Sequence, residues 1–360
     1  MNNRIKRVLT VAIIVMAIMV TIVPFLTAGA VRAAEQPYVF TTIDFPGAVY
    51  TQANGINAGG EIVGLYVDIN SKWHGFLFSG GVFSTIDFPD NIAGNIRTTQ
   101  ATAIGPSGDI VGQYQLYSES VKVTHGYLLT KKGEWILVDY PGNHDMTGPF
   151  RILPDGTIVG CVHDDPLPLG MHGFVIGPKG MNLFSLSGSM HMGATPNGKT
   201  LVGYQQTTPT TAQGYLLDDG NFIPFNVPGS TLTLALDINP ARVTVGAYIV
   251  GGIYHGFLVE TSKSAVEDWQ FTTIDYPGAT QTRVRGINAG GDMVGNYIDS
   301  AAKTHGFLAS RTQREKELRE ALDLGKRVKS GQVYVDENVD LTEYFNSLAD
   351  IQAKYDSLRQ

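Results

Sequence analysis

Residues 40–48 read FTTIDFPGA and residues 271–279 read FTTIDYPGA, with eight of the nine positions identical. Two nearly identical stretches so far apart indicate a chain built from internal repeats, and the period of such repeats is diagnostic of architecture. The number and spacing of further copies therefore decide the fold.

The full repeat has the consensus GIN-x-x-G-x-IVG-x-Y, then HGF(L), then F-x-TIDFPG. Its IVG element occurs six times, at residues 62–64, 110–112, 158–160, 201–203, 244–246 and 293–295. Six copies fill residues 40–310, about 45 residues each, and every copy holds four short β-rich runs separated by turn sequences such as NAGG and LPDG. This pattern predicts an all-β fold, a six-bladed β-propeller over residues 38–310, with an open β-solenoid as the alternative.

The glycine-rich GIN element suits the innermost strand, where backbones converge on the axis. IVGxY is then the second strand of a blade, HGFL the third and TIDFP the outermost. The last copy ends at residue 310 without an outer strand. We therefore expect FTTIDFPGA, at the N-terminal end of the propeller, to complete the sixth blade by pairing with residues 305–310.

The third element carries a family resemblance. It begins with His-Gly-Phe or His-Gly-Tyr in five copies, and Gln213 replaces the histidine in the fourth. This pattern resembles the HAF-repeat family of extracellular repeat proteins, named for a His-Ala-Phe triplet. The resemblance covers residues 40–310 and implies an exported, propeller-like bacterial protein. It implies no catalytic residues.

The histidines and aspartates of the repeat are expected to be structural. Copies of one position are separated by a full blade width, which is too far for a shared metal ion with bonds of about 2 Å. We expect each histidine to form a hydrogen bond within or between blades, for instance to an aspartate of TIDFP, and the recurring tyrosines to pack between blades. The residues are His74, His125, His172, His255 and His305, with Asp44, Asp87, Asp139 and Asp275.

Three histidines break the repeat and form the candidate functional site. They fall in the third blade or its junction with the fourth, on one face, near a cysteine and acidic residues that are possible metal donors. The candidate ligand-binding or transition-metal residues are His144, Asp145, Cys161, His163, Asp164 and His191. No ligand spacing such as H-x-x-x-H or C-x-x-C accompanies them, so ordinary polar loops are the alternative and no cofactor is required.

The two ends of the chain differ from the repeats. Residues 1–33 combine a basic start, an apolar run and small residues before a cleavage site, which predicts a signal peptide, or a membrane anchor if it is retained. Residues 311–360 hold 19 charged residues and helical apolar spacing, which predict an α-helical extension that packs on the propeller or forms an oligomer.

Composition narrows the possible functions. The net charge of -7 and the absence of a basic stripe argue against nucleic-acid binding, and the single cysteine excludes an intramolecular disulfide. We therefore expect an extracellular or periplasmic binding scaffold for a protein or carbohydrate. The alternative is a metal-dependent lyase or hydrolase that uses the face with the three histidines.

Overall fold

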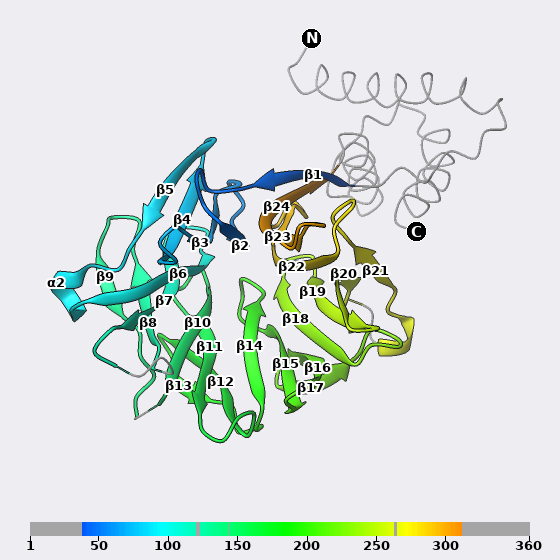
Figure 1. Cartoon of the computed structure of the whole chain (residues 1–360). Helices are drawn as coiled ribbons and strands as arrows, with labels where there is room; N and C mark the ends of the chain where they lie inside the picture. The colour runs from blue at the N-terminus through cyan, green and yellow to red at the C-terminus, as the bar shows by residue number, and fades with distance from the viewer. Residues whose placement is uncertain (1–37, 120–122, 143, 263–264, 312–360) are drawn as a thin grey trace, which may run out of the picture. The chain divides into compact units, whose positions relative to one another are not determined.

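The computed structural model describes residues 38–119, 123–142, 144–262 and 265–311. These residues confirm the all-β prediction, because strands make up most of them and helices only a few turns (Figure 1). Residues 40–310 form one compact unit. In the described ranges no helix is long and apolar enough to cross a membrane. The predicted signal peptide at 1–33 and the predicted helices of 311–360 lie outside the described residues, apart from Arg311 at the end of the last strand.

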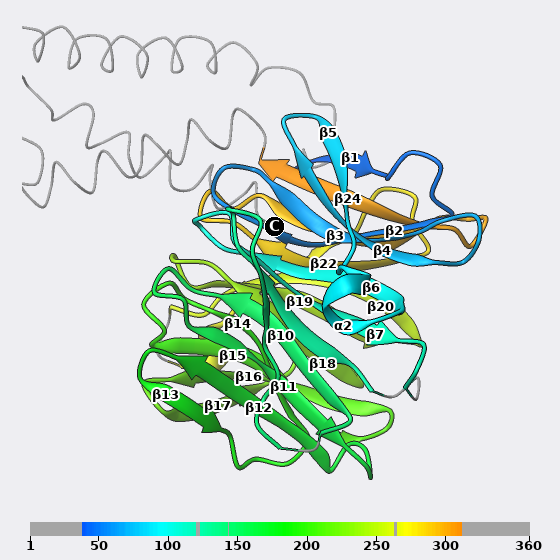
Figure 2. The ribbon, with the colours of Figure 1, turned by 90° about the vertical axis from the view of Figure 1, so that its left-hand side faces the viewer.

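The described strands fall into six groups of four, in which consecutive strands pair antiparallel. Group 1 contains β2 (Tyr50–Ile56), β3 (Ile62–Val67), β4 (Trp73–Ser79) and β5 (Val82–Ile86). Group 2 contains β6 (Ile96–Ile104), β7 (Ile110–Leu116), β8 (His125–Leu129) and β9 (Trp135–Leu137). Group 3, in the lower half of Figure 2, contains β10 (Met146–Ile152), β11 (Ile158–Asp164), β12 (Gly170–Gly177) and β13 (Gly180–Leu183).

The second half of the chain repeats this arrangement. Group 4 contains β14 (Ser189–Ala194), β15 (Thr200–Thr208), β16 (Thr211–Asp218) and β17 (Asn221–Phe225). Group 5 contains β18 (Leu232–Ile238), β19 (Val243–Val250), β20 (Ile253–Glu260) and β21 (Phe271–Ile274). Group 6 contains β22 (Gln281–Ile287), β23 (Met293–Ile298), β24 (Thr304–Arg311) and, from the other end of the chain, β1 (Tyr38–Ile43). Two short helices, α2 (Asp90–Ala93) and η2 (Val266–Asp268), lie in connections.

The contacts between groups follow one rule. The second strand of each group packs on the first strand of the next, as β3 packs on β6 and β19 on β22. The same rule joins the last group to the first, because β23 packs on β2. Figure 1 accordingly shows the groups arranged in a ring with their first strands toward the middle.

Every first strand contains a β-bulge at the same place in the repeat. In β2, for example, the register with β3 shifts between Ala53 and Gly55, so that Asn54 has no direct partner. A bulge adds one residue to a strand and re-aims its side chain. The six bulge residues are Asn54, Thr102, Phe150, Met192, Leu236 and Arg285.

The bulge explains why IVG ends in glycine. A Cβ on Gly64 would overlap the backbone carbonyl oxygen of Gln52 and the ring of Phe76. Here Gln52 belongs to the bulged first strand, and Phe76 is the phenylalanine of the HGF element in the same group. The same conflict recurs at the IVG glycine of every other group. Only glycine therefore lets the bulged strand and the aromatic ring approach the second strand together.

Histidines and aspartates of the repeat form hydrogen-bonded pairs between the third and fourth strands. The Nδ1 atom of each histidine lies near a carboxylate oxygen, at 2.8 Å for His74 and Asp87, 2.8 Å for His125 and Asp139, 2.7 Å for His255 and Asp275, and 2.6 Å for His305 and Asp44. In the third group the aspartate is missing, and His172 donates instead to the carbonyl oxygen of Phe184 at 3.0 Å.

Stacked rings join neighbouring groups beside these pairs. Phe45, which follows β1 of group 6, stacks on Tyr66 of group 1 with ring centroids 3.6 Å apart. The other face of Tyr66 stacks on His74 of its own group at 4.9 Å. Phe88 stacks on Tyr114 in the same way, at 4.0 Å. The aromatic residue after TID thus packs one group onto the next.

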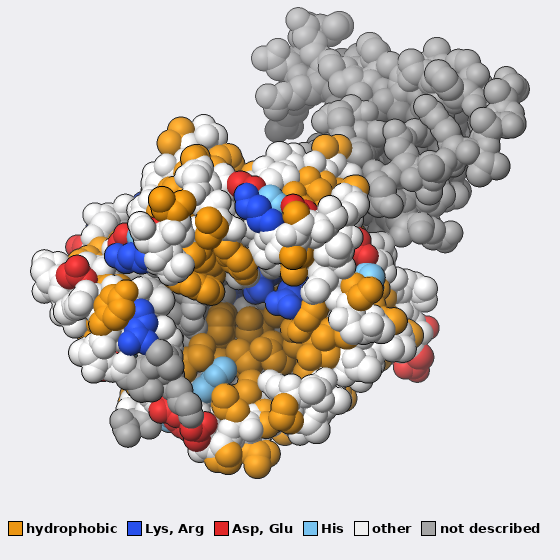
Figure 3. Space-filling model, viewed as in Figure 1, with side chains coloured by type: hydrophobic (Ala, Val, Ile, Leu, Met, Phe, Trp, Pro, Cys, Tyr) orange, Lys and Arg blue, Asp and Glu red, His pale blue; other side chains and the backbone are white. Residues whose placement is uncertain are grey.

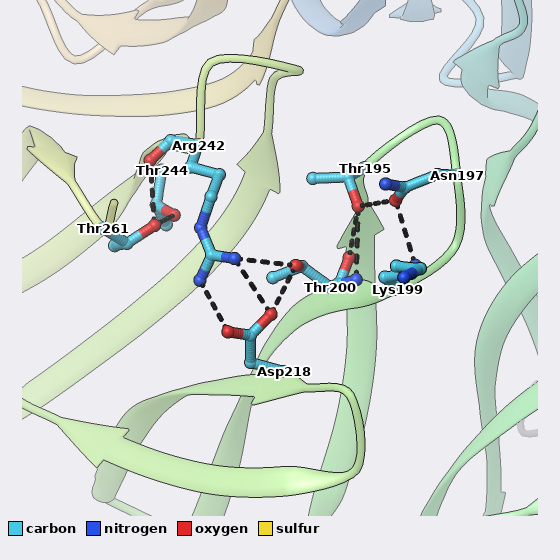
Figure 4. Close-up of polar contacts among 8 residues, drawn as sticks. All are labelled: Thr195, Asn197, Lys199, Thr200, Asp218, Arg242, Thr244 and Thr261. Carbon is cyan, nitrogen blue, oxygen red and sulfur yellow. Dashed lines mark hydrogen bonds and ion pairs between the residues drawn. The ribbon is translucent and has the colours of Figure 1, made fainter. Parts of the chain in front are cut away.

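A salt bridge strengthens the junction between groups 4 and 5 (Figure 4). The Arg242 guanidinium donates to both carboxylate oxygens of Asp218, at 3.0 and 2.9 Å, and to Thr200 Oγ1 at 3.3 Å. Thr261 holds the backbone of Arg242 by donating to its carbonyl oxygen at 2.8 Å. Bidentate pairing of this kind fixes geometry as well as charge.

Candidate functional site

Five of the six residues predicted from sequence to bind a ligand or metal take part in three side-chain pairs, one of which is made with Tyr215. The first pair joins the connection before β10 to the end of β11. His144 Nδ1 lies 2.8 Å from Asp164 Oδ2, and the backbone N–H of Asp145 donates to Asp164 Oδ1 at 3.2 Å. Asp164 therefore holds this connection in place.

The second pair is Cys161 and His163 on β11, whose Sγ and Nε2 atoms are 3.1 Å apart. The two residues are on one side of the strand because their positions differ by two. Burial raises the pKa of the Cys161 thiol well above its usual value and lowers the pKa of His163 to about 4. Both groups are therefore neutral at pH 7, as a thiol and an uncharged imidazole.

The third pair is buried between β14 and β16. His191 Nδ1 lies 2.7 Å from the hydroxyl oxygen of Tyr215, which itself donates to the carbonyl oxygen of Met190 at 2.9 Å. Only 2% of His191 is exposed, and burial lowers its pKa to about 4. Within the described residues, no group of three His, Cys, Asp or Glu side chains is placed to share a metal ion.

A cavity lies instead where the first strands of all six groups meet. It has a volume of about 100 Å³, and all six bulge residues line it. Figure 3 shows the hollow on this face, with hydrophobic side chains on its floor and Lys or Arg side chains at its wall. At each bulge, one side chain of the group therefore points toward the cavity, which all six groups share.

The lining of the cavity has a polar side and an apolar side. The bulge residues of groups 1, 2 and 6 are polar, and those of groups 3, 4 and 5 are apolar. A charged pair also lies on the apolar side, where Arg151 Nη1 donates to Asp237 Oδ2 at 3.1 Å. That aspartate also accepts hydrogen bonds from two backbone N–H groups, so the pair is internally satisfied.

Amides dominate the polar side. Gln52 Nε2 donates to Asn54 Oδ1 at 2.8 Å, and Gln100 Nε2 donates to Gln113 Oε1 at 2.5 Å. Gln113 is only 3% exposed, and its Nε2 atom has no hydrogen-bond partner among the described residues. A buried donor in this state costs about 1–3 kcal/mol, so it is a natural contact for a ligand oxygen.

Arg285 supplies the charge on the polar side. Its Nε donates to Asn296 Oδ1 at 2.8 Å, which is its one hydrogen bond to the described part of the chain. Burial lowers the pKa of Arg285 to about 10, so that it remains protonated at neutral pH. Two residues away, the guanidinium of Arg283 lies 3.6 Å above the ring of Tyr254. Cationic groups at this site are therefore held by amide and aromatic partners.

Sequence reasoning missed the cavity, although a signal was available. The bulge position lies two residues before the isoleucine of GIN, and it differs in every copy while its surroundings repeat. Reading the six copies for the variable position inside a constant frame would have found Asn54 and Arg285. The sequence prediction instead placed the site at the three histidines that lie outside the repeat consensus.

Comparisons with known proteins show similarity of fold only. No family model and no curated protein matches the chain. Among solved structures, it is similar to one from a study of two prolyl endopeptidases, with 14% identity, a TM-score of 0.45, and coverage of 73% of this chain and 42% of that chain. TolB from Acinetobacter baumannii gives 12% identity, a TM-score of 0.46, and coverage of 69% and 63%. The β-propeller domain of the Trilobed protease from Pyrococcus furiosus gives 10% identity, a TM-score of 0.45, and coverage of 72% and 80%. The chain spans less than two thirds of the first two structures, and none of these likenesses carries an argument about function.

Proposed function

We propose that the protein is an exported six-bladed β-propeller, closed by β1, that acts as a binding scaffold. The proposed closure is supported by the pairing of β1 with β24 and by the packing of β23 on β2. Export rests on the signal-like sequence of residues 1–33 and on the resemblance of the repeats. Mass spectrometry of the secreted or periplasmic protein tests export, since cleavage leaves a chain that begins near residue 34.

The central cavity is the proposed ligand site. The observation that carries this proposal is that all six bulge residues line one cavity and differ chemically between otherwise similar repeats. A purely structural position is expected to keep one residue type, as the IVG glycine does. A binding site built from six similar repeats needs different residue types at this position, because an asymmetric ligand requires different side chains around it. A small ligand, or one projecting group of a protein or carbohydrate, fits this space.

A bulky substitution in the cavity tests the proposal. Met192→Trp fills part of the space with a rigid ring, while Met181→Trp places the same ring on β13, where Met181 is 57% exposed. Full-length wild type and both variants are screened by thermal shift against organic acids, amines, neutral amides and monosaccharides, since a ligand that binds the folded state raises Tm.

Compounds that stabilise the wild type and Met181→Trp are expected to lose their effect on Met192→Trp. The melting temperature of the unliganded variants shows that both still fold. Ligands that bind Met192→Trp as strongly as the wild type, or a complete lack of ligands in all four classes, would contradict the cavity as the binding site.

A further inference from the structure

The chemistry of the cavity wall points to one class of ligand. Resting on the proposed use of the cavity, we infer that it binds a small organic acid: a carboxylate attached to an apolar body. Three features carry the inference: an arginine that no carboxylate of the described chain neutralises, a buried amide donor that lines the same cavity, and an apolar wall on the other side.

Arg285 is the anchor for the carboxylate. Its Nε is engaged by Asn296, and its two terminal nitrogens have no hydrogen-bond partner in the described residues. A guanidinium presents two parallel N–H groups that match the two oxygens of a carboxylate. Arg283 adds a second positive charge nearby, and it lowers the pKa of Arg285 further. The ion pair of Arg151 and Asp237 adds no net charge, so the cavity as a whole is cationic.

One amide donor completes the polar side. Gln113 lines the cavity with a buried Nε2 that donates to no atom in the described part of the chain. Its Oε1 is already occupied by Gln100 at 2.5 Å, which fixes the amide with its nitrogen free. A ligand oxygen would satisfy this donor, whereas a ligand ammonium group would be repelled by Arg285, and the Asp237 carboxylate in the lining is already paired with Arg151. The site therefore selects acceptors over donors.

The apolar wall faces the arginine. Group 3 stands opposite group 6 in a ring of six, so Phe150 lies across the cavity from Arg285. Met192 and Leu236 continue the apolar side through groups 4 and 5. Burial of hydrocarbon against such a wall is favourable. An inorganic anion has no hydrocarbon to cover this wall and would leave it in contact with water.

The cavity volume limits the size of the acid. One water needs about 10–15 Å³ of such space, so a cavity of about 100 Å³ holds on the order of eight water-sized groups. A benzoate or a short-chain fatty acid is of this size. Benzoate is the better probe, because a neutral relative of nearly the same shape, benzamide, is available.

Calorimetric titration of the full-length protein with benzoate, benzamide and inorganic phosphate, at concentrations up to about 10 mM, tests the inference. Benzoate should bind at least tenfold more tightly than benzamide or phosphate. Arg285→Gln should weaken benzoate binding at least tenfold, because a charge-assisted hydrogen bond is lost, and should leave benzamide unchanged. Lys303→Gln, which removes an exposed positive charge on the connection before β24, is the matched control and should change neither.

The outcomes separate this inference from the proposed function. Equal binding of benzoate and benzamide, equal binding of phosphate, or no effect of Arg285→Gln would overturn the organic-acid assignment. Absence of benzoate binding up to the highest concentration would overturn it too. The cavity itself would still stand as the binding site if another ligand were lost on Met192→Trp. Benzoate that binds Met192→Trp and wild type equally would instead refute the cavity.

Discussion

The two nearly identical stretches of sequence provide a direct test of ring closure. Ile43 in FTTIDFPGA is 5% exposed, and Ile274 in FTTIDYPGA is 3% exposed. Ile274 belongs to β21, which follows β20 along the chain, whereas Ile43 belongs to β1 and packs against a cluster that includes Val294 of group 6 and Phe76 of group 1. Both side chains are thus buried, but only Ile43 lies on a strand that pairs with a strand from the other end of the chain, β24.

Truncation of a buried isoleucine to alanine costs about 2–5 kcal/mol, from lost transfer free energy and the cavity that remains. If β1 closes the ring, Ile43→Ala and Ile274→Ala should each lower the free energy of unfolding by about 3 kcal/mol. If β1 only lies loosely on the edge of group 6, Ile43→Ala should cost less than about 1 kcal/mol, as surface substitutions do.

Guanidinium unfolding of the full-length protein, followed by tryptophan fluorescence, measures both changes as shifts of the midpoint at constant m-value. Thr41→Ala on β1 is the control, because Thr41 is exposed and its truncation leaves no cavity. Deletion of residues 38–47 should lower the unfolding midpoint more than Ile43→Ala does. All six groups should be destabilised, not group 6 alone. A small effect of Ile43→Ala beside a large effect of Ile274→Ala would refute closure by β1.

Three further substitutions test the local physics. Burial lowers the pKa of His191 to about 4, so on acidification the unfolded chain binds this proton before the folded chain does. The contribution of His191 to the free energy of unfolding should therefore fall by about 2 kcal/mol between pH 7 and pH 5. In chemical unfolding, His191→Gln should remove that part of the pH dependence. Gly295→Ala should lower the free energy of unfolding by roughly 3 kcal/mol because its Cβ overlaps a carbonyl oxygen and a ring. Gly290→Ala should cost under about 1 kcal/mol by the same assay, because its Cβ would meet only side-chain ends, the nearest being Asn288 Oδ1 at 3.3 Å. Arg242→Gln should cost only about 1 kcal/mol in thermal unfolding, because both it and Asp218 are 31% exposed; a loss of several kcal/mol would show that the junction of groups 4 and 5 depends on this pair.

Much of the fold could be predicted because the repeat itself encodes it. The IVG and HGF elements lie on the second and third strands of each group, and the TID element on the fourth, as their order in the sequence indicates. The pairing of His305 with Asp44 follows from the same repeat, although 261 positions separate the two residues. Repetition makes such long-range contacts predictable, because a pairing between two elements of one copy is expected between the equivalent elements of every other copy.

The candidate site was less predictable for a physical reason. His191 was expected near a connection, but it lies inside β14 with its imidazole against Tyr215. A histidine can take a core position when burial keeps it neutral and a hydroxyl group accepts its proton in a hydrogen bond, and no periodicity of the sequence reports this. Likewise, the direction of a bulged side chain is set by backbone geometry, which strand-pattern reasoning does not include.

The constant and variable positions of the repeat therefore depend on each other. Gly64 is required because the carbonyl oxygen of Gln52 approaches the second strand, and that approach accompanies the bulge at Asn54. The bulge in turn directs Asn54 into the cavity, while the equivalent bulge in VRGIN directs Arg285 there. A side chain at this position is not needed for pairing, so it is free to differ from copy to copy. The invariant glycine thus preserves the frame that lets six different residues meet in one cavity, and a change of ligand requires substitutions only at the bulges.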